Sequence, residues 1–389
     1  LIAIDQEKAF DKIDRGFLFK ILKKLNLGKS FVRAIKQTMK NAQSLIINNG
    51  YLSAPFKIER GVRQGDPISL MLYCIAVETL ALDFKNNKKI DGIPLPGTKT
   101  NLKVMQYADD TTVAARDINS LEEIFKTLEK FERASGSNIN KNKTKGLALG
   151  NFDHAECDSL LKQRRNNNVV VNWVNDSGLK ILGITFFTDL RRTAAQNWQK
   201  AYESFKGKLK NFKYRNVSLR CKSIYVNTLA LSKVWFVANV FPIGKETEKL
   251  IKKEISIYLW QNNFAEPIKR DILNLPVERG GLGILNAHDQ CLALRTKHML
   301  QIKENPKPHE KYFLQKYTLA FSLTNLAKNK YPQWIFLTEN NYPKTLNEPP
   351  FYYKDVTDLL RQNQAIFDIQ HKTSKNIYLY LASLKQNTN

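Results

Sequence analysis

Apolar and polar positions along the first half of the chain alternate between strand-like and helix-like patterns. Leu1-Ile2-Ala3-Ile4 is typical of a buried strand, and apolar residues at helical spacing follow from Phe17 to Leu25. A long apolar helix is expected from about Ser69 to Phe84, and a further helix from Ser120, where Ser120 and Glu123 form the pattern of a capping box. A helix that Ser30 can cap and a hairpin formed by residues 45–47 and 56–58 are expected between residues 25 and 69, and further strands are predicted at residues 102–106, 111–115, 146–149 and 179–187. The order β-α-α-β-β-α-β-β-α-β predicts an α+β domain, in which an antiparallel sheet carries helices on one face.

From about Arg191 onward the pattern is almost wholly helical, and an amphipathic helix is expected from Lys245 to Trp260. Beyond about residue 300, prolines interrupt short helical pieces. We therefore expect three regions: residues 1–190 as the α+β domain, residues 191–300 as a helical domain, and residues 301–389 as a mostly helical region of unknown role.

The charge balance narrows the class of partner. The 389 residues include 61 Lys and Arg against 36 Asp and Glu, a formal net charge of +25. A surface of this kind attracts phosphates, so nucleic acid is the expected partner. The four cysteines form no C-x-x-C pair, which argues against a disulfide scaffold and a zinc knuckle. The apolar stretch Ile224–Phe241 contains Asn and Lys residues, so no membrane partner is expected.

Tyr107-Ala108-Asp109-Asp110 places two adjacent carboxylates between two expected strands. Alone, such a pair is more often a solvated turn than a metal site. A third carboxylate, Asp5, ends the first apolar strand and could align beside this hairpin, although Asp11 and Asp14 compete for the role. Three convergent carboxylates suit two magnesium ions and phosphoryl transfer.

These residues carry a resemblance to the reverse transcriptases of non-LTR (LINE-type) retrotransposons. Five segments follow the family's motifs A to E in order: residues 4–13 (IDQEKAFDKI), 60–69 (RGVRQGDPIS), 107–110 (YADD), 135–144 (SGSNINKNKT) and 182–184 (LGI). Five ordered motifs are a far more specific signal than YADD alone. The resemblance implies a reverse-transcriptase palm followed by an α-helical thumb.

The resemblance also implies roles for individual residues. Asp5, Asp109 and Asp110 would be catalytic and hold Mg²⁺ (two ions, with Mn²⁺ as a possible substitute), and Lys143 would be a catalytic cation near the pyrophosphate. Phe10 would exclude a 2′-hydroxyl, although periodicity alone makes it a core residue. Nucleotide and template contacts would come from Phe10, Arg63, Gln64, Gly65 and Tyr107, and primer contacts from Leu182 and Gly183.

A basic stretch interleaved with aromatic residues follows in the helical region. Its composition favours contact with a nucleic-acid backbone over a merely solvated helix. The residues assigned to this contact are Lys206, Lys208, Lys210, Lys213 and Arg215.

Together these patterns predict an RNA-directed DNA polymerase of a non-LTR retrotransposon. It would use an RNA template, a DNA primer or target and deoxynucleoside triphosphates, in the nucleus with a possible cytoplasmic ribonucleoprotein stage. The alternatives are a non-catalytic nucleic-acid-binding remnant of such an element, or a palm protein like a group II intron maturase. Because the chain opens inside an apolar run at Leu1, we also expect that the family's fingers motifs precede it in a longer protein.

Overall fold

The computed structural model describes residues 1–94, 101–140, 142–150, 155, 158–159, 171–213, 215–261 and 267–304. The chain divides into two compact units, Leu1–Leu190 and Arg191–Asn389, which are described separately below. The region predicted at residues 301–389 lies almost entirely outside the described residues.

The first unit is built on a five-stranded sheet in the order β13-β12-β1-β10-β9. Its strands are β1 (Ile2–Ile4), β9 (Val104–Tyr107), β10 (Asp110–Val113), β12 (Lys145–Gly146) and β13 (Asn172–Trp173). The pairs β9–β10, β10–β1 and β1–β12 are antiparallel, but β12 and β13 run parallel. The prediction of a purely antiparallel sheet was therefore wrong. A parallel neighbour requires a long connection, and residues 147–171 supply one.

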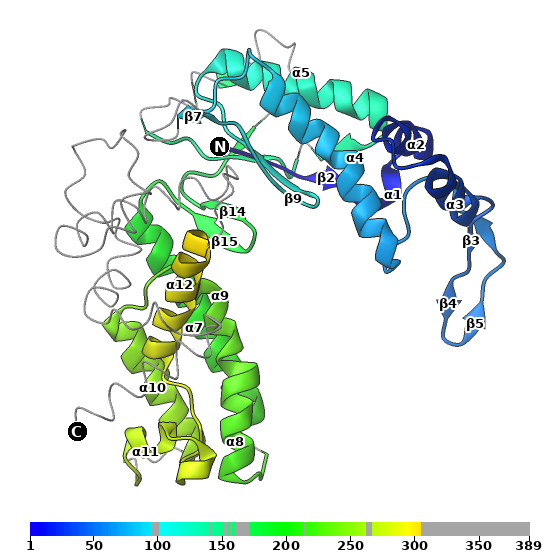
Figure 1. Ribbon diagram of the computed structural model, residues 1–389. Helices are drawn as coiled ribbons and strands as arrows, with labels where there is room; N and C mark the ends of the chain where they lie inside the picture. Colours follow the sequence, from blue (N-terminus) through cyan, green and yellow to red (C-terminus); the bar gives the residue numbers. More distant parts are fainter. Residues whose placement is uncertain are drawn as a thin grey trace. The chain divides into compact units, whose positions relative to one another are not determined.

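Helices α2 (Arg15–Lys24), α4 (Pro67–Asn86) and α5 (Ile118–Ser135) pack together on the sheet (Figure 1). Ile2 and Ile4 of β1 are buried in the core that these helices share. Leu1 and Ala3 instead pack against a second, smaller cluster on the other face, formed by Leu147, Val174 and Leu179. The alternation along β1 thus matches the strand period of two.

Helix α4 is the central core helix of this unit. Among the described residues it alone has the length and apolar composition that a membrane span would need, and 44% of its most apolar window is buried here. Asp66 forms its N-cap, because the carboxylate accepts from the Ile68 backbone NH at 3.1 Å, and Pro67 follows at the first helical position.

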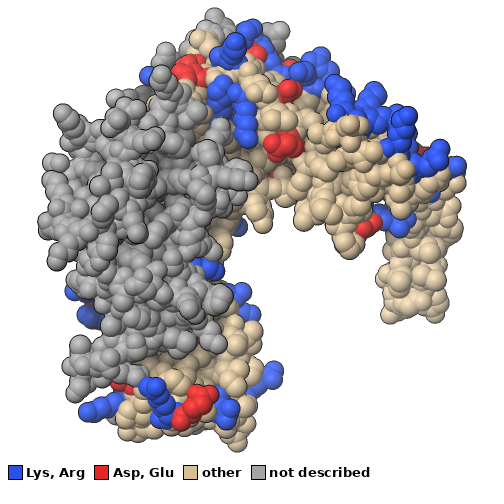
Figure 2. Space-filling view, viewed as in Figure 1, with Lys and Arg blue, Asp and Glu red and all other residues tan. Residues whose placement is uncertain are grey.

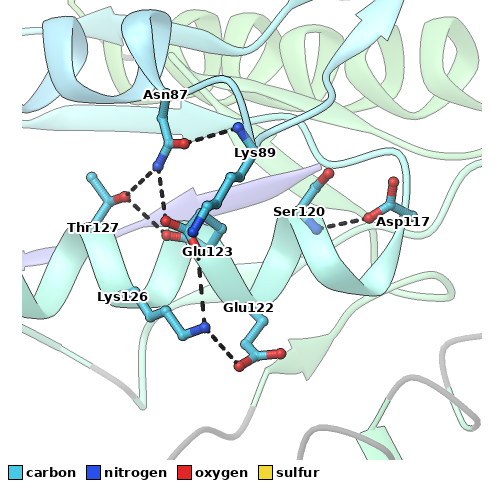
Figure 3. A network of polar contacts seen from close by, with 8 residues as sticks. All are labelled: Asn87, Lys89, Asp117, Ser120, Glu122, Glu123, Lys126 and Thr127. Carbon is cyan, nitrogen blue, oxygen red and sulfur yellow. Dashed lines mark hydrogen bonds and ion pairs between the residues drawn. The ribbon is translucent and has the colours of Figure 1, made fainter.

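Polar contacts join the end of α4 to α5 (Figure 3). The Asn87 side chain donates to Glu123 at 3.1 Å and to Thr127 at 3.4 Å. The α5 N-cap is Asp117, which accepts from the Ser120 backbone NH at 2.7 Å. The predicted capping box at Ser120 was wrong, because the carboxylate three residues earlier caps the helix.

The segment predicted as one strand from Leu179 to Phe187 is a hairpin. Strands β14 (Leu179–Ile181) and β15 (Ile184–Phe186) pair across a two-residue turn at Leu182 and Gly183. Both turn residues have positive φ, +46° and +86°, which matches the tight turn that the right-handed twist of a hairpin favours.

The other elements of this unit are short. Helix α1 (Ala9–Lys12) follows β2 (Gln6–Glu7), which pairs with β11 (Asn138–Ile139), and α3 (Lys29–Met39) packs on α2. Three further strand pairs are β3–β6 (Gln43–Ser44 with Phe56–Lys57), β4–β5 (Ile47–Asn48 with Tyr51–Leu52) and β7–β8 (Ile93–Pro94 with Asn101–Leu102). The first two lie on one arm that projects beyond α3 (Figure 1).

The second unit is helical throughout its described residues. It contains α7 (Leu190–Phe212), α8 (Leu219–Tyr225), a π-helical turn (Val226–Ala230), α9 (Ser232–Ala238), α10 (Lys245–Leu259), α11 (Arg270–Asn274), a 3₁₀ turn (Val277–Arg279) and α12 (Ala287–Glu304). Buried apolar residues from α7, α9, α10 and α12 include Phe205, Val234, Ile251 and Ala293. The expected mixed α and β architecture, followed by a helical region, is confirmed at this level.

Candidate active site

Asp5 comes directly after the buried strand β1 and is half-buried. Its backbone carbonyl accepts from the Asn140 NH at 2.8 Å. The competing carboxylate Asp14 has a structural task, because it accepts from the Phe17 backbone NH at 2.7 Å and caps α2. Asp11 lies exposed in the short helix α1.

The hairpin β9–β10 presents the other two carboxylates. Tyr107 pairs with Asp110, so Ala108 and Asp109 form the turn, and Ala108 adopts φ +51°. In the antiparallel pair of β1 and β10, Ile4 lies opposite Thr111. The residue that follows Ile4 and the residue that precedes Thr111 are Asp5 and Asp110, so these two residues lie opposite each other. All three carboxylates therefore lie at the same end of the sheet.

These carboxylates influence one another electrostatically. The pKa of Asp110 is raised, first by partial burial and then by the negative charges of Asp109 and Asp5, against the opposing charge of Lys180. The charge of Asp109 also contributes to the raised pKa values of Tyr73 and Cys74 on α4, where burial is the larger cause. The end of the sheet is thus a focus of negative potential.

Carboxylates are the side-chain ligands that Mg²⁺ prefers, so this donor set suits magnesium by its chemistry. As they stand, no three His, Cys, Asp or Glu side chains among the described residues are close enough together to hold a metal ion. Lys180 was not expected here. It is the middle residue of β14, and only the three-dimensional position of that hairpin reveals its proximity to Asp110.

Phe10 lies beside this acidic end in α1, half-buried, with its ring stacked on Tyr73 at 4.4 Å between centroids. The Tyr73 hydroxyl donates to Gln6 Oε1 at 2.8 Å in the buried interior. Tyr73 therefore supports both Phe10 and the segment after Asp5. Its location inside a continuous apolar helix gave no functional signal in the sequence.

The loop before α4 is held against the same segment. The NH of Val62 donates to the Phe10 carbonyl at 2.8 Å, and the NH of Gly61 donates to the Ile13 carbonyl at 2.9 Å. Arg15 extends this contact by donating to the Gly61 carbonyl at 3.1 Å and to the Met39 carbonyl at 2.9 Å. Arg15 is a positioning residue that sequence reasoning did not identify.

Beyond this anchored part, Arg63, Gln64 and Gly65 are exposed. Arg63 donates to the Gln43 carbonyl at 3.4 Å, and Gly65 has φ +87° with open space around it. The loop is thus available to a ligand, while Asp66 is engaged as the α4 cap.

Tyr107 and Lys143 are also exposed. The Tyr107 side chain at the end of β9 is 70% exposed. Lys143 follows β11, and its charge contributes to the lowered pKa of Glu7, for which the hydrogen bond from Lys12 is the main cause. Lys143 therefore lies on the side of the sheet where the chain leaves Asp5.

At the β14–β15 hairpin, Leu182 is 46% exposed at the turn despite its positive φ of +46°. A non-glycine residue in this conformation, with an apolar side chain in solvent, is uncommon and marks a position where function can outweigh stability. Gly183 completes the turn.

In the second unit the predicted basic residues have different environments. Lys206 forms an ion pair with Glu254 of α10 at 2.8 Å, and Arg215 lies over the Phe212 ring at 4.7 Å. Phe212 in turn stacks on Tyr225 at 3.9 Å. Lys222 in the same basic stretch is buried and donates to the Leu259 carbonyl at 3.0 Å. Lys208 and Lys210 are exposed on α7, and Lys213 follows it half-buried. Part of the basic stretch therefore stabilises the helical unit.

Comparison with known proteins identifies the class of the first unit. Residues 1–186 match the family model described as reverse transcriptase (RNA-dependent DNA polymerase). Residues 1–186 therefore form a reverse transcriptase domain, as the motifs predicted.

Within that family the chain is related to the proteins of non-LTR retrotransposons. It is 28% identical over 361 residues to the transposon TX1 uncharacterized 149 kDa protein of Xenopus laevis, an alignment that covers 91% of this chain and 26% of the relative. It is 24% identical over 307 residues to the retrovirus-related Pol polyprotein from type-2 retrotransposable element R2DM of Drosophila melanogaster, covering 77% of this chain and 28% of the relative. The chain thus spans about a quarter of the length of these relatives.

Proposed function

We propose that this chain contains the catalytic palm of a retrotransposon reverse transcriptase that adds deoxynucleotides to a DNA 3′-hydroxyl on an RNA template. The observation that carries the proposal is the register of the sheet, which aligns Asp5 with Asp110 and sets Asp109 beside them in the turn. The mutual repulsion of these carboxylates is the electrostatic condition that divalent cations relieve.

Asp5 and Asp109 would be the principal magnesium ligands, and Asp110 would complete the cluster. When bound, two magnesium ions supply activation of the attacking hydroxyl and stabilisation of the departing pyrophosphate. Lys143 would add positive charge at the triphosphate. Phe10, held by its stack on Tyr73, would restrict the space available at the 2′ position of the incoming sugar.

The exposed loop of Arg63, Gln64 and Gly65 would contact the nucleotide and template, together with Tyr107. Leu182 and Gly183 would contact the primer strand. Lys208 and Lys210 retain exposed positions suited to phosphate contact, whereas Lys206 has a carboxylate partner on α10. We place the activity in the nucleus, with a cytoplasmic ribonucleoprotein stage, which fluorescence microscopy of the tagged chain would test.

Primer extension on a poly(rA)/oligo(dT) substrate tests the activity, and Mn²⁺ binding followed by electron paramagnetic resonance tests the metal site separately. The test variant carries Asp109→Ala and Asp110→Ala. A matched control carries Glu203→Ala and Glu246→Ala, which removes two exposed carboxylates of the second unit and so makes the same change in net charge.

We expect extension and Mn²⁺ binding in the parent and the control, and the loss of both in the test variant. Salt-sensitive RNA binding with neither extension nor Mn²⁺ binding in the parent would refute the catalytic assignment. That result would favour the nucleic-acid-binding remnant instead.

A further inference from the structure

The helical hairpin of α2 and α3 has an unusual charge composition. No Asp or Glu occurs between Asp14 and Glu59, while eight Lys and Arg residues lie from Arg15 to Lys40. Arg15 is used internally, since it donates to backbone carbonyls. The other seven are exposed: Lys20, Lys23, Lys24, Lys29, Arg33, Lys36 and Lys40.

None of these seven cations forms an ion pair with a carboxylate of the described residues, and what sets them apart from other unpaired cations, such as Lys208 and Lys210, is that they gather on one helical hairpin that has no acidic residue of its own. Several exposed lysines elsewhere do have such partners. Lys126 pairs with Glu122 at 3.0 Å, Lys130 with Asp83 at 3.1 Å, and Lys252 with Glu248. In Figure 2, Lys and Arg gather over the region of α2 and α3 with little acidic surface among them.

The cations on α3 form one stripe. Lys29, Arg33 and Lys36 are spaced i, i+4 and i+7 on an exposed face beside the buried Val32 and Ile35, and Lys40 continues the stripe at the end of the helix. At a rise of about 1.5 Å per residue the stripe is roughly 16 Å long. Like charges at this spacing destabilise a helix, so in isolation the arrangement costs stability.

Two hollows adjoin the stripe. One, of about 670 Å³, is lined by Lys23, Lys29, Arg33 and Lys36 at the turn between the helices. The other, of about 400 Å³, is lined by Arg15, Phe19, Lys36 and Lys40. Lys36 borders both, with its ammonium 5.2 Å from the centroid of the Phe19 ring. The surface is therefore contoured as well as charged.

We propose that the α2–α3 surface, defined by those seven exposed cations, is a separate binding site for the sugar-phosphate backbone of a nucleic acid. Unpaired cations in a stripe match a polyanion whose charges recur about every 3.4 Å along one strand. The site goes beyond the proposed polymerase activity, because backbone binding here requires none of the acidic residues. It would hold a nucleic-acid segment in addition to the one at the acidic end of the sheet.

The test measures how the affinity of the full chain for nucleic acid depends on salt concentration. The test variant replaces Lys29, Arg33, Lys36 and Lys40 with Gln. The matched control replaces four lysines that have carboxylate partners, Lys126, Lys130, Lys249 and Lys252, with Gln. Both variants lose four positive charges, so net charge alone cannot separate them.

We expect the slope of log K against log salt to become less steep by about 3 in the test variant, since each lost phosphate contact contributes roughly 0.7 to 0.9. The control should change far less. Equal slopes in the two variants would overturn the proposal. A 20-nucleotide RNA and a duplex DNA of the same length show which nucleic acid is preferred, and tight binding of poly-glutamate at the same ionic strength would point to an acidic protein instead.

A measurement on the unmodified chain guards against misfolding of the variant. Acetylation of lysines is followed by mass spectrometry with and without the RNA. We expect protection of Lys29, Lys36 and Lys40 and little change at Lys126 and Lys249. Unchanged acetylation of the stripe lysines would overturn the proposal, whatever the outcome of the primer-extension test.

Discussion

Gly61 offers the sharpest test of how the loop before α4 is positioned. Its φ is +72°, and a Cβ atom there would lie 2.5 Å from the Phe10 carbonyl oxygen and 2.6 Å from Asp11 Cα. Both neighbours are backbone atoms, which cannot swing away as a flexible side chain would. Gly61→Ala must therefore displace the loop or the segment that follows Asp5.

Three effects contribute to the loss of folding stability expected for Gly61→Ala. The left-handed conformation costs about 1 to 2 kcal/mol for a residue with a Cβ. Overpacking against fixed neighbours adds about 1 to 3 kcal/mol. Displacement also weakens the hydrogen bonds from Gly61 to Ile13 and from Val62 to Phe10. We expect a total destabilisation of roughly 3 to 5 kcal/mol, at the upper end for a single substitution.

The assay is urea denaturation, with Gly50→Ala as the matched control. Gly50 has φ +85°, but a Cβ atom at this position would have no neighbour within 4 Å, so only the conformational cost of about 1 to 2 kcal/mol applies. With a slope of about 3 kcal/mol/M, Gly61→Ala should shift the midpoint by roughly 1 M or more. Equal shifts in the two variants would refute the claim that close backbone approach is what requires glycine at position 61.

Three further outcomes are expected. Asp117→Ala removes the α5 cap and should lower the free energy of unfolding by about 1 kcal/mol, whereas Asp117→Asn should largely retain it; equal losses would contradict the capping role. Tyr73→Phe leaves the buried Gln6 oxygen without its donor and should cost about 1 to 3 kcal/mol in urea denaturation, so an unchanged midpoint would show that this hydrogen bond contributes nothing net. Leu182→Gly relieves a positive φ and should stabilise the chain by about 1 kcal/mol, while primer extension falls if the exposed leucine contacts the primer; undiminished extension would argue against that contact.

Much of the fold could be predicted because its signals are local. The apolar helix α4, the amphipathic helix α10 and the acidic turn of the β9–β10 hairpin are each defined by residues within one short stretch. The parallel partner β13 could not be predicted, since nothing near Asn172 and Trp173 reveals that the chain returns beside β12. Non-local pairing of this kind depends on the whole domain.

The candidate active site also contains some features that local sequence predicts and others that depend on the tertiary structure. Asp5, Asp109 and Asp110 could be proposed together because Asp5 follows one recognisable strand, and Asp109 and Asp110 lie where the chain turns between two others. The partner of Lys206, Glu254, lies on a different helix, and the proximity of Lys180 to Asp110 depends on the position of a hairpin that was predicted as one strand. Composition identifies a cation, but only tertiary structure shows whether a carboxylate already neutralises it.

To judge which basic residues can bind nucleic acid, it matters more whether each cation already has a carboxylate partner than how many cations occur in one stretch of sequence. Lys206 and Lys222 belong to the densest basic stretch of the sequence, yet one pairs with a glutamate and the other is buried under a helix end. The cations from Lys29 to Lys40 are more widely spaced in the sequence, but they have no acidic partner among the residues that the structure describes. Exposed pairs contribute little to stability and bind phosphate only after breaking, whereas unpaired cations release counterions directly when a polyanion binds. The cations of α3 are therefore available for nucleic-acid binding together with the exposed Lys208 and Lys210 of α7, whereas Lys206 must first leave Glu254 and Lys222 stabilises the helical unit.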